Sequence, residues 1–239
     1  MSIQVQELEY GDGEHVFTAH VAWDEAVSGP RPGVLVSHAW GGRSQFEDRK
    51  AERLAELGYV GFALDVYGKG IRGSSPEENS ALMTPLIEDR ATLQARMKLA
   101  LKELRGVSHV DPGKTAAIGF CFGGLCVLDL ARTGADVRGV VSFHGLLGLP
   151  DNLDGVSVSA KALVLHGWQD PLAPPEQVLA FAQDMDARGA DWQLHAYGTS
   201  MHAFTNPVAN DPDNGLLFDA TAEHRSWDSM QLFLNEVFA

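Results

Sequence analysis

Short apolar runs alternate with longer amphipathic stretches along this chain, and the alternation predicts strands and helices in turn. The predicted strands are Ile3–Leu8, Val16–Val21, Val34–Ser37, Tyr59–Leu64, Thr115–Ile118, Arg138–Phe143, Ala162–Leu165 and Trp192–Ala196. The predicted helices are Phe46–Leu57, Leu86–Leu104, a stretch that ends near Arg132, Pro175–Ala187 and Ala220–Phe238. Because parallel strands need crossover connections, which are usually helical, we expect an α/β fold with a mostly parallel sheet and helices on both faces.

Turn signals refine this picture at several points. Gly11-Asp12-Gly13 separates the first two strands with no helix between them, so we expect these strands to form an antiparallel N-terminal edge. Gly58 follows the first helix where a C-terminal cap belongs. Gly70–Asn79 has the composition of a loop. Since no Pro/Gly/Ser-rich linker divides the sequence, we expect a single domain over residues 1–239.

The charge balance narrows the classes of partner. The 239 residues include 32 acidic and 18 basic side chains, a formal net charge of −14, and 45% are hydrophobic. A surface this negative repels phosphate backbones and anionic lipids, so we expect neither nucleic acid nor a membrane as a partner. The N-terminus lacks the basic and apolar segments of a secretory signal, and no apolar run approaches the roughly 20 residues of a membrane span.

Cysteine usage is sparse. The two cysteines, Cys121 and Cys126, lie five residues apart in one segment and would occupy different faces of a helix. We therefore expect them not to pair, which fits a reducing compartment and a cytoplasmic protein.

The strongest chemical signal is the segment from Gly119 to Gly124, which reads Gly-Phe-Cys-Phe-Gly-Gly between an apolar strand and a helix. A nucleophile elbow needs small residues two places before and two places after the reactive side chain, because the turn is too tight for a β-carbon there. Here the reactive position is Cys121, and the start of the following helix favours its thiolate. The alternative is a glycine-rich turn around a buried structural cysteine.

A thiol nucleophile needs a base, and the base needs an acid that orients it. Asp170 follows the predicted strand Ala162–Leu165, and His202 lies in a loop after the strand Trp192–Ala196. Both follow Cys121 in the order nucleophile, acid, histidine that hydrolases of this architecture use. The alternatives are a turn cap for Asp170 and a loop histidine satisfied by the backbone for His202.

An acyl-transfer intermediate also needs two aligned backbone donors for its oxyanion. We expect one to be the N–H of Phe122, directly after the nucleophile, and the other to be the N–H of Trp40. Trp40 lies in the loop His38-Ala39-Trp40-Gly41-Gly42, whose glycines allow the amides to turn toward a site. An ordinary Gly-Gly turn is the alternative.

These residues resemble the dienelactone hydrolase family of α/β-hydrolases. The resemblance rests on the cysteine elbow, on Asp170 after His-Gly-x-x, on His202 in x-His-x-Phe and on the stretch Leu64–Gly68, and it covers the chain from about Gln4 to Phe238. It implies one α/β-hydrolase domain without a large lid. It also implies a triad of Cys121, His202 and Asp170 that hydrolyses esters or lactones without a cofactor.

Two positions depart from the family pattern. The founding enzymes carry a glutamate that helps control cysteine ionisation where this chain has Ala39, next to His38. They also carry an arginine that grips the substrate carboxylate where this chain has Asn206. Loss of that contact, worth about 1.5–3 kcal/mol for a hydrogen bond to a charged group, together with the acidic surface, favours neutral small esters over an anionic dienelactone.

Further residues are assigned by position to the pocket or to the core. His38, Ala39, His144, Trp168, Phe204 and Asn206 are the candidate substrate-binding residues. His144 could instead be a hydrogen-bonded strand-end histidine, and the aromatic side chains could belong to the core. No H-x-x-x-H or H-E-x-x-H spacing supports a metal site. The charge-rich stretches Glu47–Glu56 and Glu88–Glu103 are expected to be solvated helix faces.

The sequence thus predicts a carboxylic ester or lactone hydrolase that forms an acyl-enzyme on Cys121, with a small-molecule substrate, no metal and no cofactor. A thioester substrate or acyl transfer to another acceptor is a variant of the same chemistry. The alternative of a different class is a low-turnover ligand-binding or thiol-sensing protein, because a thiol without the glutamate at Ala39 would acylate slowly. Monomer and dimer are both left open.

Overall fold

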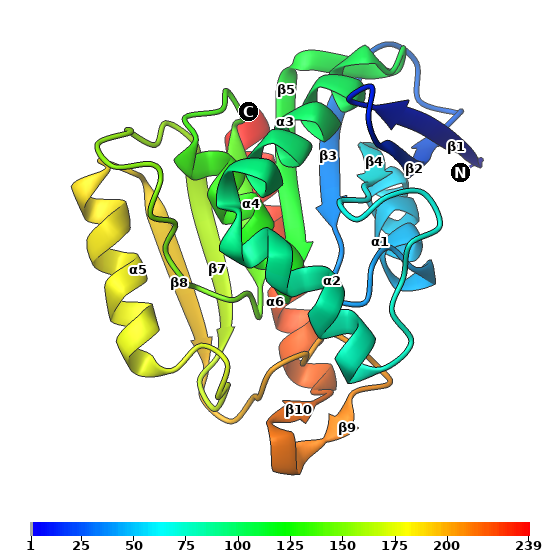
Figure 1. Ribbon diagram of the computed structural model, residues 1–239. Coiled ribbons are helices and arrows are strands. Elements are labelled where there is room, and N and C mark those ends of the chain that lie inside the picture. Colours follow the sequence, from blue (N-terminus) through cyan, green and yellow to red (C-terminus); the bar gives the residue numbers. More distant parts are fainter. Residues whose placement is uncertain (1) are drawn as a thin grey trace. The chain divides into compact units, whose positions relative to one another are not determined.

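The computed structural model describes residues 2–239, and the chain divides into two compact units, Met1–Ile118 and Gly119–Ala239. Both units combine parallel strands with helices, as the hydrophobic pattern predicts (Figure 1). The mixed α/β class with a mostly parallel sheet and an antiparallel edge is therefore confirmed.

The first unit builds its sheet in the order β1-β2-β4-β3-β5. Its elements are β1 (Ile3–Gly11), β2 (Val16–Asp24), β3 (Arg31–Ser37), α1 (Gln45–Glu56), β4 (Val60–Ala63), α2 (Pro76–Glu88), α3 (Arg90–Gly106) and β5 (Val110–Phe120), whose last two residues belong to the second unit. Strand β2 runs antiparallel to β1 and to β4, whereas β3 and β4 are parallel. The predicted antiparallel edge is thus β1 and β2.

Helices α1 and α3 cover opposite faces of this sheet. A β-carbon on Gly33 of β3 would lie 2.9 Å from the side chain of Leu104 in α3. A β-carbon on Gly61 of β4 would lie 2.2 Å from the Ala51 carbonyl oxygen in α1. Gly61 is paired with Val34, the neighbour of Gly33, so the two glycines face opposite sides. The missing side chains let each helix approach the sheet closely.

The second unit continues the strand–helix alternation. Its elements are α4 (Phe122–Arg132), β6 (Gly139–Phe143), β7 (Lys161–Gly167), α5 (Pro175–Ala187), β8 (Trp192–Tyr197), β9 (Asn210–Asp211), a short 3₁₀ helix (Pro212–Asn214), β10 (Leu216–Leu217) and α6 (Ala220–Phe238). Strands β6, β7 and β8 are parallel neighbours, and β9 pairs with β10 in a small antiparallel ribbon. The parallel order places the loops after β6, β7 and β8 at one edge of these strands.

The prediction of one helix over Leu86–Leu104 is wrong. Two helices occupy this region, and they are separated at Asp89, which has φ −113° and ψ 78°. The Asp89 carboxylate accepts hydrogen bonds from the N–H and hydroxyl groups of Thr92, so it caps α3 and stops α2. Part of the stretch expected to be a loop, Gly70–Asn79, is the first turn of α2.

Sequence signals mark the N-terminus of helix α2. Ser75 is its N-cap and accepts a hydrogen bond from the Glu78 N–H, and Pro76 occupies the first helical position. The Ser-Pro-x-Glu pattern is a start signal that outweighs the loop-like composition of the preceding residues. The other predicted elements are present, and the observed bounds of α5 and α6 equal the predicted ones.

Among residues 2–239, no helix combines the length and apolar character needed to cross a bilayer. Organisation as a single domain stays a prediction, because the two units are compact separately.

Candidate active site

Cys121 occupies the turn between β5 and α4. It is the N-cap residue of α4, has φ 56° and ψ −119°, and is partly exposed. A residue other than glycine whose backbone lies in this region of positive φ is strained, and such strain persists only where the surrounding structure enforces it. The Cys121 N–H donates to the Phe143 carbonyl oxygen at 3.0 Å, which fixes the turn to the end of β6.

Gly119 permits this turn, and Gly124 lets the start of α4 lie against Gly145. A β-carbon on Gly119 would lie 2.0 Å from the carbonyl oxygen of Gly123, and one on Gly124 would lie 2.6 Å from the Cα of Gly145. Both contacts are with backbone atoms, so a side chain could not be accommodated by rotating a neighbour. The strand–turn–helix geometry that an elbow needs is therefore present at Cys121.

Asp170 and His202 lie together in the same unit. Asp170 follows β7 and is buried, and its Oδ2 lies 2.7 Å from Nδ1 of the buried His202. The other carboxylate oxygen, Oδ1, accepts the N–H of Leu172 at 2.8 Å. The carboxylate therefore sets the imidazole tautomer with hydrogen on Nδ1 and leaves Nε2 for chemistry.

The charge state of His202 depends on its two partners. Burial by itself lowers the pKa of His202, but the negative charge of Cys121 and the carboxylate of Asp170 oppose burial and raise this pKa to about 10. A thiolate on Cys121 thus holds His202 as an imidazolium, and the attraction between these charges favours the ionised pair. This electrostatic relation places Cys121, His202 and Asp170 in one interacting set.

Two further histidines lie beside this set. The His144 ring lies 5.2 Å from the His202 ring between centroids, and its Nε2 is 2.8 Å from the Thr205 hydroxyl. His144, at the end of a strand, also has a backbone in the left-handed region, with φ 38°. His166 is buried at the end of β7, and burial lowers its pKa, so its imidazole is neutral near pH 7.

The other candidate site residues of this unit differ in their exposure and in their contacts. Phe122 and Phe204 are fully buried, and Phe204 packs its ring against His144 at 5.1 Å. Trp168 is 47% exposed and meets the His166 ring edge-on at 6.1 Å. Asn206 closes a turn by donating its N–H to the Ala203 carbonyl oxygen. Among these residues, Trp168 is the one with a large apolar surface open to solvent.

The remaining candidates belong to the first unit. His38 is fully buried; its Nε2 accepts the N–H of Val66 at 3.2 Å, and its Nδ1 lies 2.7 Å from the Ala39 carbonyl oxygen. The Trp40 carbonyl oxygen accepts the hydroxyl of Tyr67 at 2.8 Å. These contacts fix the conformation of the loop, and its role at the oxyanion stays a prediction.

Glu47, in the first turn of α1, has a structural role that the charge pattern of the sequence does not predict. Glu47 is buried rather than part of a solvated face, and it accepts the N–H groups of Ser44 at 2.8 Å and Ala39 at 3.3 Å. The Ser-x-x-Glu spacing of a capping box was the available signal. Glu47 therefore fastens the residues after β3 to the start of α1.

Comparison with known proteins places the chain in a family. The model of the dienelactone hydrolase family matches residues 17–238. An uncharacterized protein of Caenorhabditis elegans is 42% identical over 154 residues, which are 62% of this chain and 95% of that protein. A probable 2-oxo-3-(5-oxofuran-2-ylidene)propanoate lactonase of a Bradyrhizobium species is 28% identical over 188 residues, 74% of this chain and 75% of that one.

A solved structure agrees with these relatives. The crystal structure of a dienelactone hydrolase-like promiscuous phosphotriesterase from metagenomic libraries is 37% identical, has a TM-score of 0.96 and covers 100% of both chains. The family match spans most of the chain, from residue 17 to residue 238. The chain belongs to the dienelactone hydrolase family of α/β-hydrolases and is a carboxylic ester hydrolase.

Proposed function

We propose that this enzyme hydrolyses neutral small esters or lactones through a thioester acyl-enzyme on Cys121. The observation that carries the proposal is the set of Cys121 at a strained strand-to-helix turn, His202 with its raised pKa, and Asp170 at 2.7 Å from the imidazole. A thiolate needs an imidazolium partner at the start of the reaction and a base at the end, and one imidazole can supply both.

The first half of the reaction forms the acyl-enzyme. The Cys121 thiolate attacks the carbonyl carbon, and the carbonyl π electrons move to oxygen to give a tetrahedral oxyanion. The backbone N–H groups of Phe122 and Trp40 are the proposed donors to that oxyanion. As the oxyanion collapses, the carbon–oxygen bond to the alcohol breaks, and His202 donates its proton to the leaving alkoxide.

The second half restores the thiolate. Neutral His202 accepts a proton from water, and the resulting hydroxide oxygen attacks the thioester carbon. The carbon–sulfur bond breaks, the carboxylic acid leaves, and the thiolate again faces an imidazolium. Asp170 accepts the hydrogen on Nδ1 throughout and holds the imidazole in one tautomer. The residues of the chain therefore suffice for the proton and electron balance of ester hydrolysis.

The loops around the triad support a neutral, apolar substrate. Residues 144–155, 167–174 and 198–209, which follow β6, β7 and β8, contain no lysine or arginine. Asn206 occurs where the family has its arginine, so a carboxylate substrate would find no lysine or arginine on these loops. Trp168 and Leu172, 47% and 44% exposed, offer apolar surface after β7. Esters with apolar groups fit these side chains better than anionic dienelactones.

The test of this function is a rate comparison. We expect p-nitrophenyl acetate and butyrate to be hydrolysed faster than an anionic dienelactone, and Cys121→Ala to lose this activity. Equal rates for wild type and Cys121→Ala would favour the low-turnover binding or thiol-sensing protein, which Ala39 leaves open. Faster turnover of the dienelactone would refute the proposed substrate preference while leaving the triad intact.

The contribution of the exposed Trp168 side chain to ester hydrolysis can be measured separately. We expect Trp168→Ser to lower kcat/KM for p-nitrophenyl butyrate by about tenfold, because burying part of a large apolar side chain against substrate is worth about 1–2 kcal/mol. Leu179→Ser on α5, 60% exposed and outside the loops that follow β6, β7 and β8, is the matched control. Equal losses in both variants would contradict a substrate contact at Trp168.

Phosphotriesters are a second proposed substrate class. The relative of known structure that aligns over the whole chain at 37% identity is described as a promiscuous phosphotriesterase. In this reaction the thiolate would attack phosphorus and expel a phenolate, and water would then cleave the phosphorus–sulfur bond. The test is release of p-nitrophenolate from diethyl p-nitrophenyl phosphate. No release above the Cys121→Ala background would exclude this activity.

Location and assembly remain as the sequence predicts them. Cys121 and Cys126 are both thiols, which is compatible with the proposed cytoplasmic location. A small-molecule ester is the proposed partner, and monomer and dimer are both compatible with the proposed mechanism.

A further inference from the structure

The loop that carries His202 is joined by hydrogen bonds to the segment that leads into α6. The His202 N–H donates to the Gly215 carbonyl oxygen at 2.8 Å, and the Leu217 N–H donates to the His202 carbonyl oxygen at 3.1 Å. These two bonds form a bridge between His202 and Leu216. They hold the backbone of His202, but they do not by themselves hold the residues on either side of it.

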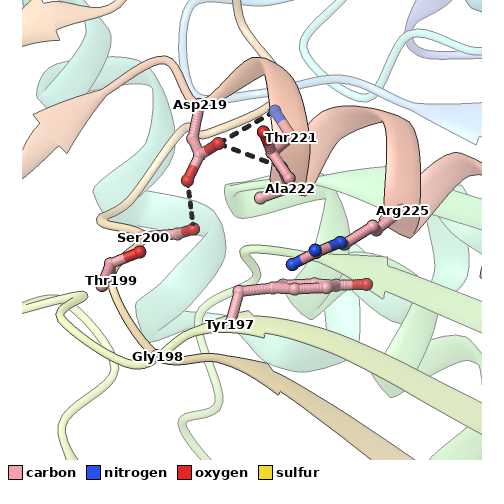
Figure 2. Close-up of a pocket in the computed structure, with 8 residues that line it drawn as sticks. All are labelled: Tyr197, Gly198, Thr199, Ser200, Asp219, Thr221, Ala222 and Arg225. Atoms are coloured by element: carbon pink, nitrogen blue, oxygen red, sulfur yellow. Dashed lines mark hydrogen bonds between the residues drawn. The ribbon is translucent and has the colours of Figure 1, made fainter.

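Asp219 reaches the residues on both sides of His202. Its backbone N–H donates to the Phe204 carbonyl oxygen at 3.1 Å, and its Oδ2 accepts the hydroxyl of Ser200 at 2.8 Å. Ser200 is 2% exposed, so its hydroxyl has little access to water as a substitute partner. Figure 2 shows the Ser200 hydroxyl and the Asp219 carboxylate turned toward each other. The loop is therefore held two residues before and two residues after His202.

Asp219 is itself rigidly placed. It is the N-cap of α6, and its Oδ1 accepts the N–H groups of Thr221 and Ala222, both at 3.0 Å. A carboxylate that caps a 19-residue helix cannot rotate freely toward solvent. Ser200 is thus anchored to the end of a long helix that packs on β6 and β7.

We infer that Ser200 and Asp219 form a clip that positions His202 against Cys121 and Asp170, so that both are positioning residues of the reaction. The inference rests on the proposed function, because it assigns to the clip the task of holding the catalytic base. The clip touches no reacting atom. Its effect reaches the chemistry through the backbone of residues 200–204 and the side chain of His202.

The clip lies in the wall of a surface pocket, where Asp219 is partly exposed and Ser200 is buried. The pocket has a volume of about 310 Å³ and is lined by Tyr197, Gly198, Thr199, Ser200, Asp219, Thr221, Ala222 and Arg225. Hydrogen bonds from Ala222 and Ser200 lower the pKa of Asp219, and Arg225 contributes in the same direction. The carboxylate is therefore ionised across the neutral range, where the enzyme is expected to work.

Removal of one hydroxyl tests the clip. We expect Ser200→Ala to lower kcat by about tenfold, equivalent to about 1.4 kcal/mol, with little change in KM, because the base is misplaced and the substrate pocket is intact. Ser200→Thr, which keeps the hydroxyl, should restore most of the rate. Thr199→Ala removes a hydroxyl from the neighbouring residue of the same pocket and is the matched control. Ser200→Cys, similar in size and a weak donor, is the second variant if Ser200→Ala does not fold.

A second readout separates positioning from general destabilisation. Alkylation of Cys121 by iodoacetamide reports the thiolate that His202 stabilises, so its pH profile should move to higher pH in Ser200→Ala and stay unchanged in Thr199→Ala. A Ser200→Ala enzyme whose kcat and alkylation profile equal those of Thr199→Ala would overturn the clip. Ester hydrolysis that survives the substitution Cys121→Ala would instead overturn the triad. Failure of the clip and failure of the proposed function are therefore distinguishable.

Discussion

The substitution Gly119→Ala is the sharpest structural test of the elbow. It adds one carbon atom, which would lie 2.0 Å from the Gly123 carbonyl oxygen, 2.3 Å from the Gly123 carbonyl carbon and 2.8 Å from the Gly124 nitrogen. All three atoms belong to the backbone of the turn and the first residues of α4. No side-chain rotation can relieve the overlap, so the turn itself must open.

The size of the effect follows from these distances. A tolerable contact of about 3.0 Å requires the turn to open by about 1 Å, and overpacking of this kind costs about 1–3 kcal/mol of unfolding free energy. A displacement of about 1 Å at a reacting group lowers the rate by about 100-fold. We therefore expect Gly119→Ala to lose more activity than the loss of folded protein explains.

Urea unfolding and steady-state hydrolysis of p-nitrophenyl acetate measure the two effects. The matched control is Gly148→Ala in the same unit, because an added β-carbon there meets nothing within 4 Å. We expect the control to keep both the unfolding midpoint and kcat/KM of the wild type. If Gly119→Ala matched the control in both measurements, the reasoning about the elbow would be refuted.

Three more predictions concern charge. Asp170→Asn should lower kcat by about 10³–10⁴-fold, because the imidazole loses its tautomer control; a loss below tenfold in a steady-state assay would count against the triad. Since the pKa of His202 is raised to about 10, the imidazolium that stabilises the Cys121 thiolate persists below that pH and is lost above it, so iodoacetamide should alkylate Cys121 well below pH 8. His202→Asn should shift that profile toward that of an ordinary thiol, whose pKa is about 8.5, and an unmoved profile would contradict the pairing. Arg132→Ala should cost about 3–5 kcal/mol in urea unfolding, because Arg132 is fully buried and bonds Asp184 at 2.9 Å; a cost under 1 kcal/mol would disprove this.

Much of the fold is readable from the sequence because its local signals agree with its tertiary packing. The helices Pro175–Ala187 and Ala220–Phe238 have the observed bounds, since proline or an aspartate cap marks each start. The break at Asp89 was missed because the apolar spacing continues across it, and a side-chain cap decided the outcome. The two-residue strands β9 and β10 were missed because they are too short to show alternation.

Only part of the candidate site could be predicted from the sequence. Cys121, Asp170 and His202 follow strand ends, and strand ends can be located from apolar runs, so the order of the three residues sufficed to select them. The clip of Ser200 and Asp219 could not be predicted. It joins two residues 19 positions apart through one hydrogen bond, and no periodicity encodes which hydroxyl meets which carboxylate.

The most direct test of the central claim is the mass of the enzyme during turnover. Wild-type protein is mixed with p-nitrophenyl butyrate, quenched in acid within the first turnovers, digested and examined by mass spectrometry. We expect a butyryl group on the peptide that contains Cys121, and no such adduct in Cys121→Ala. A butyryl group on another residue, or hydrolysis at the wild-type rate in Cys121→Ala, would contradict the central claim.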